Sequence, residues 1–101
     1  MTNENKETKI KELKTGMDKL NLTVEIDMVA PKKNYWEYGE TPRITIIVKD
    51  DSGDIKMTLF EEENVKKAKE GKRFKITNGY VTEYNGQLQL NSIREDPIVW
   101  L

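Results

Sequence analysis

The chain of 101 residues contains no cysteine and no histidine. Without cysteine it has no disulfides, no thiolate zinc sites and no cysteine nucleophile. Without histidine it also lacks the side chain that most often serves as general base or metal ligand. The carboxylates of Glu25 and Asp27 have no basic or hydrophobic partner nearby in sequence, so we interpret them as solvated. We therefore expect no enzymatic activity, no metal and no cofactor.

An excess of charge of either sign is also missing. The chain has 17 Lys and Arg against 18 Asp and Glu, and its formal net charge at pH 7 is −1. This balance argues against a protein that coats duplex DNA through phosphate contacts alone, although a local basic stripe remains compatible with it. No apolar run approaches the roughly 20 residues that span a bilayer, and the polar N-terminus is unlike a secretory signal. We expect a cytoplasmic protein with no membrane partner.

Alternating apolar and polar side chains predict three strands in the first 60 residues. The clearest strand covers residues 20–28, and the next two cover residues 43–49 and 55–60. The turn at 51–54 joins the second and third strands as a hairpin. The side chains of the first strand that are expected to face the core are Leu20, Leu22, Val24, Ile26 and Met28.

A short helix and two more strands are predicted in the second half. Residues 61–70 begin with glutamates and end with lysines, which complements the helix dipole. A long strand at 73–84 changes its inward parity at 78–79, which predicts a bulge. The Asn-Gly pair at 85–86 is a strong hairpin signal and leads into a last strand at 87–91.

This order of elements predicts one small all-β domain. Five short strands with one short helix between strands three and four describe an OB-fold, a five-stranded Greek-key barrel. We place this domain at residues 9–95, after a disordered tail at 1–8 and before a tail or truncation point at 96–101. Barrels of this class bind ligands over strands two and three, a fold-level analogy that needs support from side chains.

Three aromatic side chains stand on the polar side of the predicted strands. Phe60 has the parity of Lys56, and both Tyr80 and Tyr84 have the parity of Thr82. Rings on the outer face of a sheet, close to lysines, suit a flat and negatively charged ligand such as stacked bases on a phosphate backbone. Two other interpretations stay open: an aromatic packed under the helix, and ordinary surface tyrosines.

Three segments, at 13–24, 48–60 and 79–91, resemble the single-stranded DNA-binding OB domains of archaea and their eukaryotic relatives. More distantly, they resemble replication protein A. The resemblance covers nearly the whole predicted domain. It implies base stacking at the family's aromatic positions, which are occupied here by Phe60, Tyr80 and Tyr84. The family usually carries Trp at the first of these positions, and Phe offers a smaller ring for stacking.

Polar side chains complete the predicted site. Three cations share the outer face with Phe60 and are expected to contact phosphates: Arg43, Lys49 and Lys56. The resemblance also implies an arginine on strand two, which matches Arg43. Two interpretations, base-edge contact and plain exterior, stay open for the amides Gln87, Gln89 and Asn91. Trp36, in a loop at 30–42, is a candidate either for ligand contact or for covering a barrel edge.

We predict a non-enzymatic protein that binds single-stranded DNA, in replication or repair, with RNA as the less favoured ligand and no small-molecule substrate. The alternative is a protein-interaction OB module, a subunit or repeat of a replication protein A-like assembly. The near-neutral charge and the apolar segment at 98–101 favour that alternative. A third class, the anticodon-binding OB domain of a synthetase, would prefer RNA.

Overall fold

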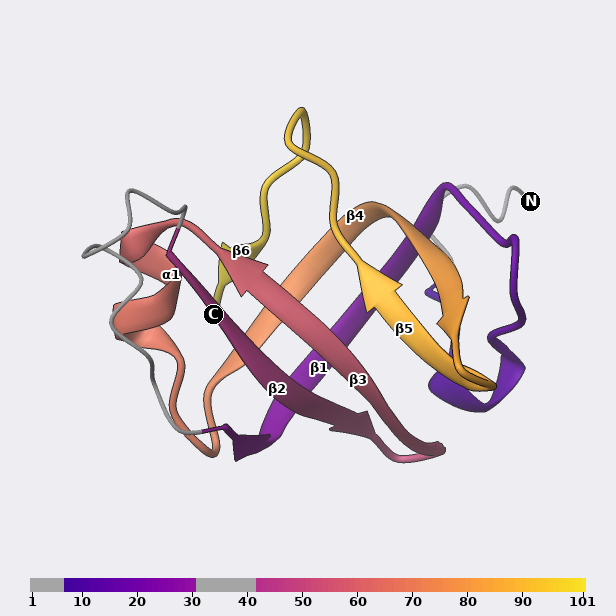
Figure 1. Ribbon diagram of the computed structural model, residues 1–101, viewed down its shortest axis with the longest axis horizontal. Coiled ribbons are helices and arrows are strands. Elements are labelled where there is room, and N and C mark those ends of the chain that lie inside the picture. The colour runs from indigo at the N-terminus through magenta and orange to yellow at the C-terminus, as the bar shows by residue number, and fades with distance from the viewer. Residues whose placement is uncertain (1–6, 31–41) are drawn as a thin grey trace.

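The computed structural model describes residues 7–30 and 42–101, which form a closed β-barrel with one short helix (Figure 1). The strands are β1 (Leu20–Val29), β2 (Arg43–Asp50), β3 (Gly53–Phe60), β4 (Arg73–Tyr84), β5 (Gln87–Asn91) and β6 (Val99–Trp100). The strand order is β1-β2-β3-β5-β4-β6, and an additional pairing of β1 with β4 closes the sheet. Helix α1 (Glu62–Lys67) lies between β3 and β4, so the predicted OB-fold is confirmed.

The barrel interior is filled by alternate side chains of the strands, as the apolar pattern predicts. The largest fully buried side chains include Phe74, Leu22, Ile26, Ile44, Ile46, Met57, Leu59, Ile76 and Leu90. The prediction that Met28 faces inward is wrong, because its side chain is 60% exposed. The register between β1 and β2 shifts between Ile26 and Met28, and the extra residue turns Met28 outward.

Strand β4 changes partners along its length. Its first half pairs with β1 and its second half pairs with β5. The predicted bulge at 78–79 is confirmed, because the β1–β4 register shifts there and Asn78 has a φ of +56°. The Asn85-Gly86 turn has φ angles of +52° and +78°, which agrees with the predicted hairpin. The bulge places Tyr80 opposite Asn91 of β5.

Both ends of the chain contribute to the barrel beyond what the sequence predicts. The backbone N–H of Thr8 donates a hydrogen bond to Asn21 O at 2.8 Å, so the end of the segment expected to be disordered lies along β1. Residues 1–6 lie outside the described residues. Within 96–101, expected to be a tail, β6 pairs with β4 and the Trp100 ring packs edge-on against Phe74, with centroids 5.2 Å apart.

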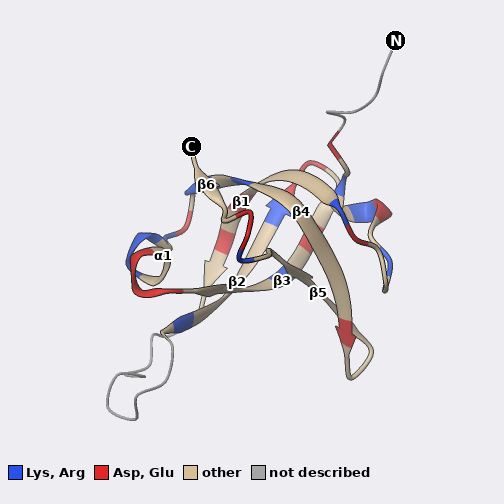
Figure 2. Cartoon of the chain, turned by 90° about the horizontal axis from the view of Figure 1, so that it is seen from above, with Lys and Arg blue, Asp and Glu red and all other residues tan. Residues whose placement is uncertain are grey.

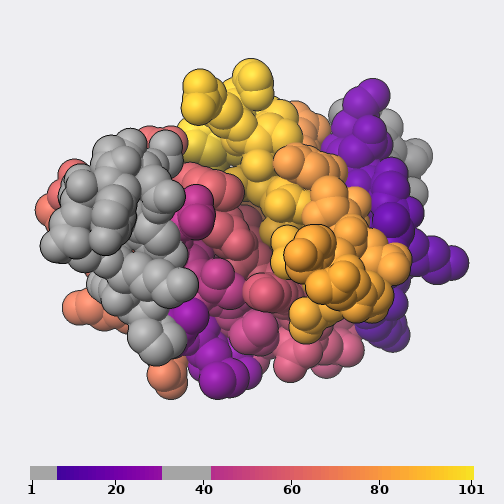
Figure 3. Space-filling model, in the orientation of Figure 1, coloured from indigo at the N-terminus to yellow at the C-terminus, as the bar shows by residue number. Residues whose placement is uncertain are grey.

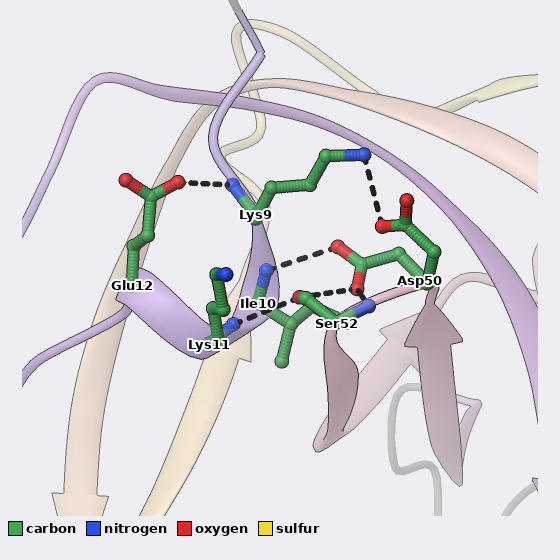
Figure 4. Close-up of polar contacts among 7 residues, drawn as sticks. Lys9, Ile10, Lys11, Glu12, Asp50 and Ser52 are labelled. Atoms are coloured by element: carbon green, nitrogen blue, oxygen red, sulfur yellow. Dashed lines mark hydrogen bonds and ion pairs between the residues drawn. The ribbon is translucent and has the colours of Figure 1, made fainter.

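The 3₁₀ turn η1 (Ile10–Glu12) is fastened to the turn between β2 and β3 (Figure 4). One carboxylate oxygen of Asp50 accepts from Ile10 N at 2.9 Å, and the other accepts from the N–H and hydroxyl of Ser52. Lys11 N donates to Ser52 Oγ at 3.1 Å. Burial alone would raise the pKa of Asp50, but these hydrogen bonds together lower that pKa below its ordinary value.

No helix within residues 7–30 and 42–101 is long and apolar enough to cross a membrane. In the same two ranges, no group of three or more acidic, histidine or cysteine side chains is arranged to hold a metal ion.

Candidate nucleic-acid interface

One outer face of the sheet runs across β2, β3, β5 and β4, with β2, β3 and β5 toward the viewer in Figure 1. Residues directly opposite each other on paired strands share a side of the sheet. Arg43 lies opposite Phe60, and Lys56 lies opposite Gln89. Gln89 in turn lies opposite Thr82 of β4, which has the same parity as Tyr80 and Tyr84. The register therefore brings the predicted aromatic, basic and amide residues to one face.

Phe60 lies at the end of β3 with 51% of its surface exposed, so it is not packed under the helix. Its carbonyl oxygen accepts a hydrogen bond from Asn64 Nδ2 at 2.9 Å, and Asn64 Oδ1 accepts from Trp100 Nε1 at 3.0 Å. The next residue, Glu61, has a φ of +78° and donates its N–H to Pro42 O at 3.0 Å. Hydrogen bonds therefore hold the backbone around Phe60 on both sides. A positive φ at a non-glycine residue such as Glu61 is strained, and such strain persists only where the surrounding structure fixes it.

The two tyrosines are exposed on the same side. Tyr80 is 38% exposed and lies opposite Asn91, and Tyr84 is 69% exposed and lies opposite Gln87. The side-chain NH₂ of Asn91 donates to Thr82 Oγ1 at 3.1 Å and to Tyr80 O at 3.3 Å. Because this amide group is engaged within the protein, Asn91 braces the tyrosine strand more directly than it offers donors to a ligand.

One of the three cations predicted on this face, Lys49, has its charge compensated by neighbouring carboxylates. Lys49 Nζ lies 3.1 Å from Asp27 Oδ1 and 3.8 Å from Glu25 Oε2. The interpretation of these two carboxylates as merely solvated is corrected, because both pair with Lys49. The hydrogen bond and charge of Asp27, with the weaker influence of Glu25, raise the pKa of Lys49. Lys49 therefore remains charged, but that charge is compensated on the protein.

Arg43 and Lys56 are the remaining predicted cations. Arg43 lies beside the ring at the end of β3, and Lys56 lies near the middle of the same strand. Among the described residues, Lys56 makes no ion pair. Figure 2 shows basic and acidic segments mixed over the barrel. Trp36 lies outside the described residues, so its two interpretations stay open.

Two hollows open beside the exposed rings. The first, of about 690 Å³, lies at the ends of β2 and β3 and is lined by Arg43 and Phe60 together with Arg94. The second, of about 640 Å³, lies beside Tyr80. Ile93 lines both hollows. Figure 3 shows this side of the molecule, with β2 and β3 recessed beside the raised β4–β5 hairpin.

Sequence reasoning missed the segment at 92–97 that contributes Ile93 and Arg94 to these hollows. This segment follows the last strand that alternation predicts, and it has no periodic pattern of its own. Its position directly after the last predicted strand was a signal that could have identified it. It leaves β5 directly after the outward amides, so its first residues had to emerge on the same face.

No protein-family model matches the chain, but comparison with known proteins finds similar ones. The chain is 32% identical over 87 residues to the single-stranded DNA binding protein Ssb of Saccharolobus solfataricus, and the match covers 85% of this chain. A solved domain of replication protein A from Methanococcus maripaludis is 26% identical, with a TM-score of 0.71 over 94% of each chain. The chain is thus similar to archaeal single-stranded DNA-binding and replication protein A-related OB domains. The resemblance predicted from its three segments is thereby confirmed.

A structure of lower identity shares the OB-fold of this chain. The OB domain of Ta0387 from Thermoplasma acidophilum superposes with a TM-score of 0.72 at 20% identity, covering 93% of this chain and 85% of that one. The chain spans 58% of the length of the curated relative from Saccharolobus solfataricus.

Proposed function

We propose that this domain binds single-stranded DNA by stacking bases on Phe60, Tyr80 and Tyr84, without enzymatic activity. The observation that carries the proposal is the exposure of all three rings on one outer face of the barrel. Base–aromatic stacking contributes about 1–3 kcal/mol per base and tolerates any sequence. The name of the relative from Saccharolobus solfataricus, a single-stranded DNA binding protein, supports this ligand.

Phosphate contacts come from Arg43 and Lys56 in this proposal. Arg43 lies directly opposite Phe60, so a phosphate next to a base on that ring is within reach of the guanidinium. Lys56 lies four residues before Phe60 on the same strand and the same face. Lys49 contributes less, because Asp27 and Glu25 already compensate its charge.

Fluorescence anisotropy with a labelled oligo-dT tests the proposal. We expect Phe60→Ala and Tyr80→Ala each to weaken binding by about 5- to 100-fold, which corresponds to the loss of one stacked base. Met28→Ala is the matched control, because Met28 is a large exposed apolar side chain that the proposal gives no role. If the double variant Phe60→Ala/Tyr80→Ala binds as tightly as the wild type, stacking is not the mechanism.

The choice of nucleic acid is tested in the same assay. We expect oligo-dT to bind more tightly than oligo-U of the same length, and duplex DNA to bind weakest, because paired bases cannot stack on the rings. Tighter binding of the RNA oligomer would favour an anticodon-binding domain.

A second candidate function is a subunit contact in a replication protein A-like assembly. The exposed apolar side chains of Val99 (57%) and Leu101 (62%) favour it, since they flank Trp100 on β6. Sedimentation equilibrium of the wild type and of Val99→Lys compares the masses in solution. A mass above that of the monomer, lost in the variant, supports the assembly contact; a monomer in both cases argues against self-association.

A further inference from the structure

Ile93 lies just beyond the end of β5, the strand that stands between β3 with Phe60 and β4 with Tyr80. In the parallel pair of β3 and β5, Lys56 lies opposite Gln89. The observed pairing ends with Met57 opposite Leu90, and Ile93 follows three residues after Leu90, as Phe60 follows three residues after Met57. On the other side of β5, Tyr80 of β4 lies opposite Asn91, two residues before Ile93.

The two hollows agree with this placement. Phe60 lines only the hollow of about 690 Å³, and Tyr80 lines only the hollow of about 640 Å³. Ile93 is the residue that belongs to both. Each volume is within the range of about 300–1,000 Å³ that is usual for small-ligand sites, so each can accept one base with part of its sugar.

The turn that carries Ile93 is held in place. Ile93 forms an isolated β-bridge with Asp96, whose N–H donates to Ile93 O at 3.3 Å. Asn78 Nδ2, at the bulge of β4, donates to Asp96 Oδ2 at 2.9 Å. The turn between β5 and β6 stands out from the barrel in Figure 1. Ile93 is half-buried on this braced turn and lines both hollows.

We propose that Ile93 is a wedge that divides the nucleic-acid path, with one base in each hollow and the isoleucine side chain between them. This inference rests on the proposed function, because the two bases are those stacked on Phe60 and Tyr80. Apolar side chains such as isoleucine insert between base steps and unstack them in other nucleic-acid complexes. Adjacent bases that bind here must separate, and each then exchanges its neighbouring base for a protein ring.

The wedge has a consequence for sequence preference. Separating two adenines costs more than separating two thymines, because purines stack more strongly on each other. Modest preferences of single-strand binders for pyrimidine runs arise in this way. We therefore expect oligo-dT to bind more tightly than oligo-dA, and Ile93→Ala to reduce this preference, because a path without the wedge leaves the two bases stacked.

The direct test uses a short oligo-dT with two adjacent 2-aminopurines at its centre, whose fluorescence rises when they unstack. At saturation with the wild-type domain we expect a clear rise. Ile93→Ala should lose most of this rise and bind about 5- to 10-fold more weakly, because most of an apolar side chain is removed. The matched control, Val99→Ala, also shortens an exposed β-branched side chain, but on β6 outside both hollows, and should keep the full rise per bound oligonucleotide.

The possible outcomes separate the wedge from the stacking proposal. An equal rise in Ile93→Ala and wild type at saturation overturns the wedge and leaves stacking untouched, provided that Phe60→Ala still weakens binding. Failure of the wild type to bind any single strand overturns both proposals. Thermal unfolding of Ile93→Ala fixes a temperature at which the variant is folded, so a lost rise reports on the complex and supports the wedge.

Discussion

Gly79 lies where β4 passes from β1 to β5, with no room for a side chain. A Cβ at this position would lie 2.7 Å from Ile76 Cγ2 and 2.9 Å from Asn91 O. The carbonyl belongs to the backbone of β5 and cannot rotate away, so Gly79→Ala must shift the strand that carries Tyr80. We expect the free energy of unfolding to fall by about 1–3 kcal/mol, as for other overpacked sites.

Thermal unfolding followed by circular dichroism measures this loss. The control is Gly53→Ala, because a Cβ there meets only Ile10 Cγ2 at 3.8 Å, an ordinary contact. The control should unfold within a few degrees of the wild type, at the same or a higher temperature, since alanine restricts the unfolded chain. Equal unfolding temperatures for Gly79→Ala and wild type would mean that the strand can shift without cost.

At this scale the sequence predicted side chains that follow strict alternation and failed where a bulge interrupts it. Phe60, Tyr80 and Tyr84 are exposed as predicted, because the strands that carry them keep their parity on either side of the bulge at 78–79. Met28 broke the prediction because a second bulge, which no glycine marks, turns it outward. Bulges depend on pairing between distant strands, and one strand alone does not reveal them.

Among the elements, β6 reaches the aromatic site through two hydrogen bonds. Trp100 Nε1 donates to Asn64 Oδ1, and Asn64 Nδ2 donates to the carbonyl of Phe60. Trp100→Phe keeps a ring packed on Phe74 but removes the first donor. We expect the free energy of unfolding to fall by about 0.5–1.5 kcal/mol, the usual contribution of one hydrogen bond, and oligo-dT binding to weaken several-fold.

A double-mutant cycle decides whether the hydrogen bonds act as one unit. Asn64→Ala should weaken oligo-dT binding as much as Trp100→Phe does, and the double variant should add little to either. The dependence of binding on salt should stay unchanged, because no phosphate contact is lost. Losses that add fully would show that Trp100 affects binding by a route other than Asn64 and Phe60.

The contact between η1 and the β2–β3 turn makes stability depend on pH. Hydrogen bonds from Ile10 and Ser52 lower the pKa of Asp50 in the folded state. The carboxylate therefore stabilises the fold above the ordinary aspartate pKa of about 3.9, and this contribution is lost as pH falls below that value. Asp50→Asn should cost about 1–3 kcal/mol at pH 7, because backbone donors lose a charged acceptor.

Chemical unfolding at pH 7 and at pH 3 measures this contribution. The difference in stability between wild type and Asp50→Asn should shrink at the lower pH, since the wild-type carboxyl begins to take up a proton there. Asp51→Asn is the control, because within residues 7–30 and 42–101 the ion pair of Asp51 is with the exposed Lys9, at 3.0 Å. A difference that grows toward acid would contradict the assignment of the lowered pKa to Asp50.

At the scale of elements, length decided what the sequence could predict. Strands β1 to β5 have enough residues to display alternation, and all five lie where the pattern places them. Strand β6 has two residues, too few to display a period. Its Trp100 lies opposite Phe74 of β4 and packs against that ring, a contact between residues distant in sequence. The hollows depend on the turn that follows β5, whose course is set by Asn78 and Asp96, far apart from each other in sequence.

For the whole molecule, the balance of charge limits how much of the binding can be electrostatic. The chain carries a formal net charge of −1, and two carboxylates already compensate Lys49. With Arg43 and Lys56 as the phosphate contacts, the logarithm of affinity should fall with the logarithm of salt at a slope of about −1.4, since each contact on a single strand contributes about −0.7. Such a shallow dependence is typical of binding dominated by stacking.

Release of Lys49 from its carboxylates should change this balance in a measurable way. In the double variant Glu25→Gln/Asp27→Asn, the ammonium of Lys49 keeps its place on the outer face of β2 but loses both compensating charges. We expect tighter binding of oligo-dT at low salt and a slope steeper by about 0.7, the contribution of one more phosphate contact. Lys49→Ala should therefore have little effect in the wild type and should cancel the gain in the double variant. A loss of about 0.7 in slope on Lys49→Ala in the wild type would show that Lys49 meets a phosphate despite its ion pairs.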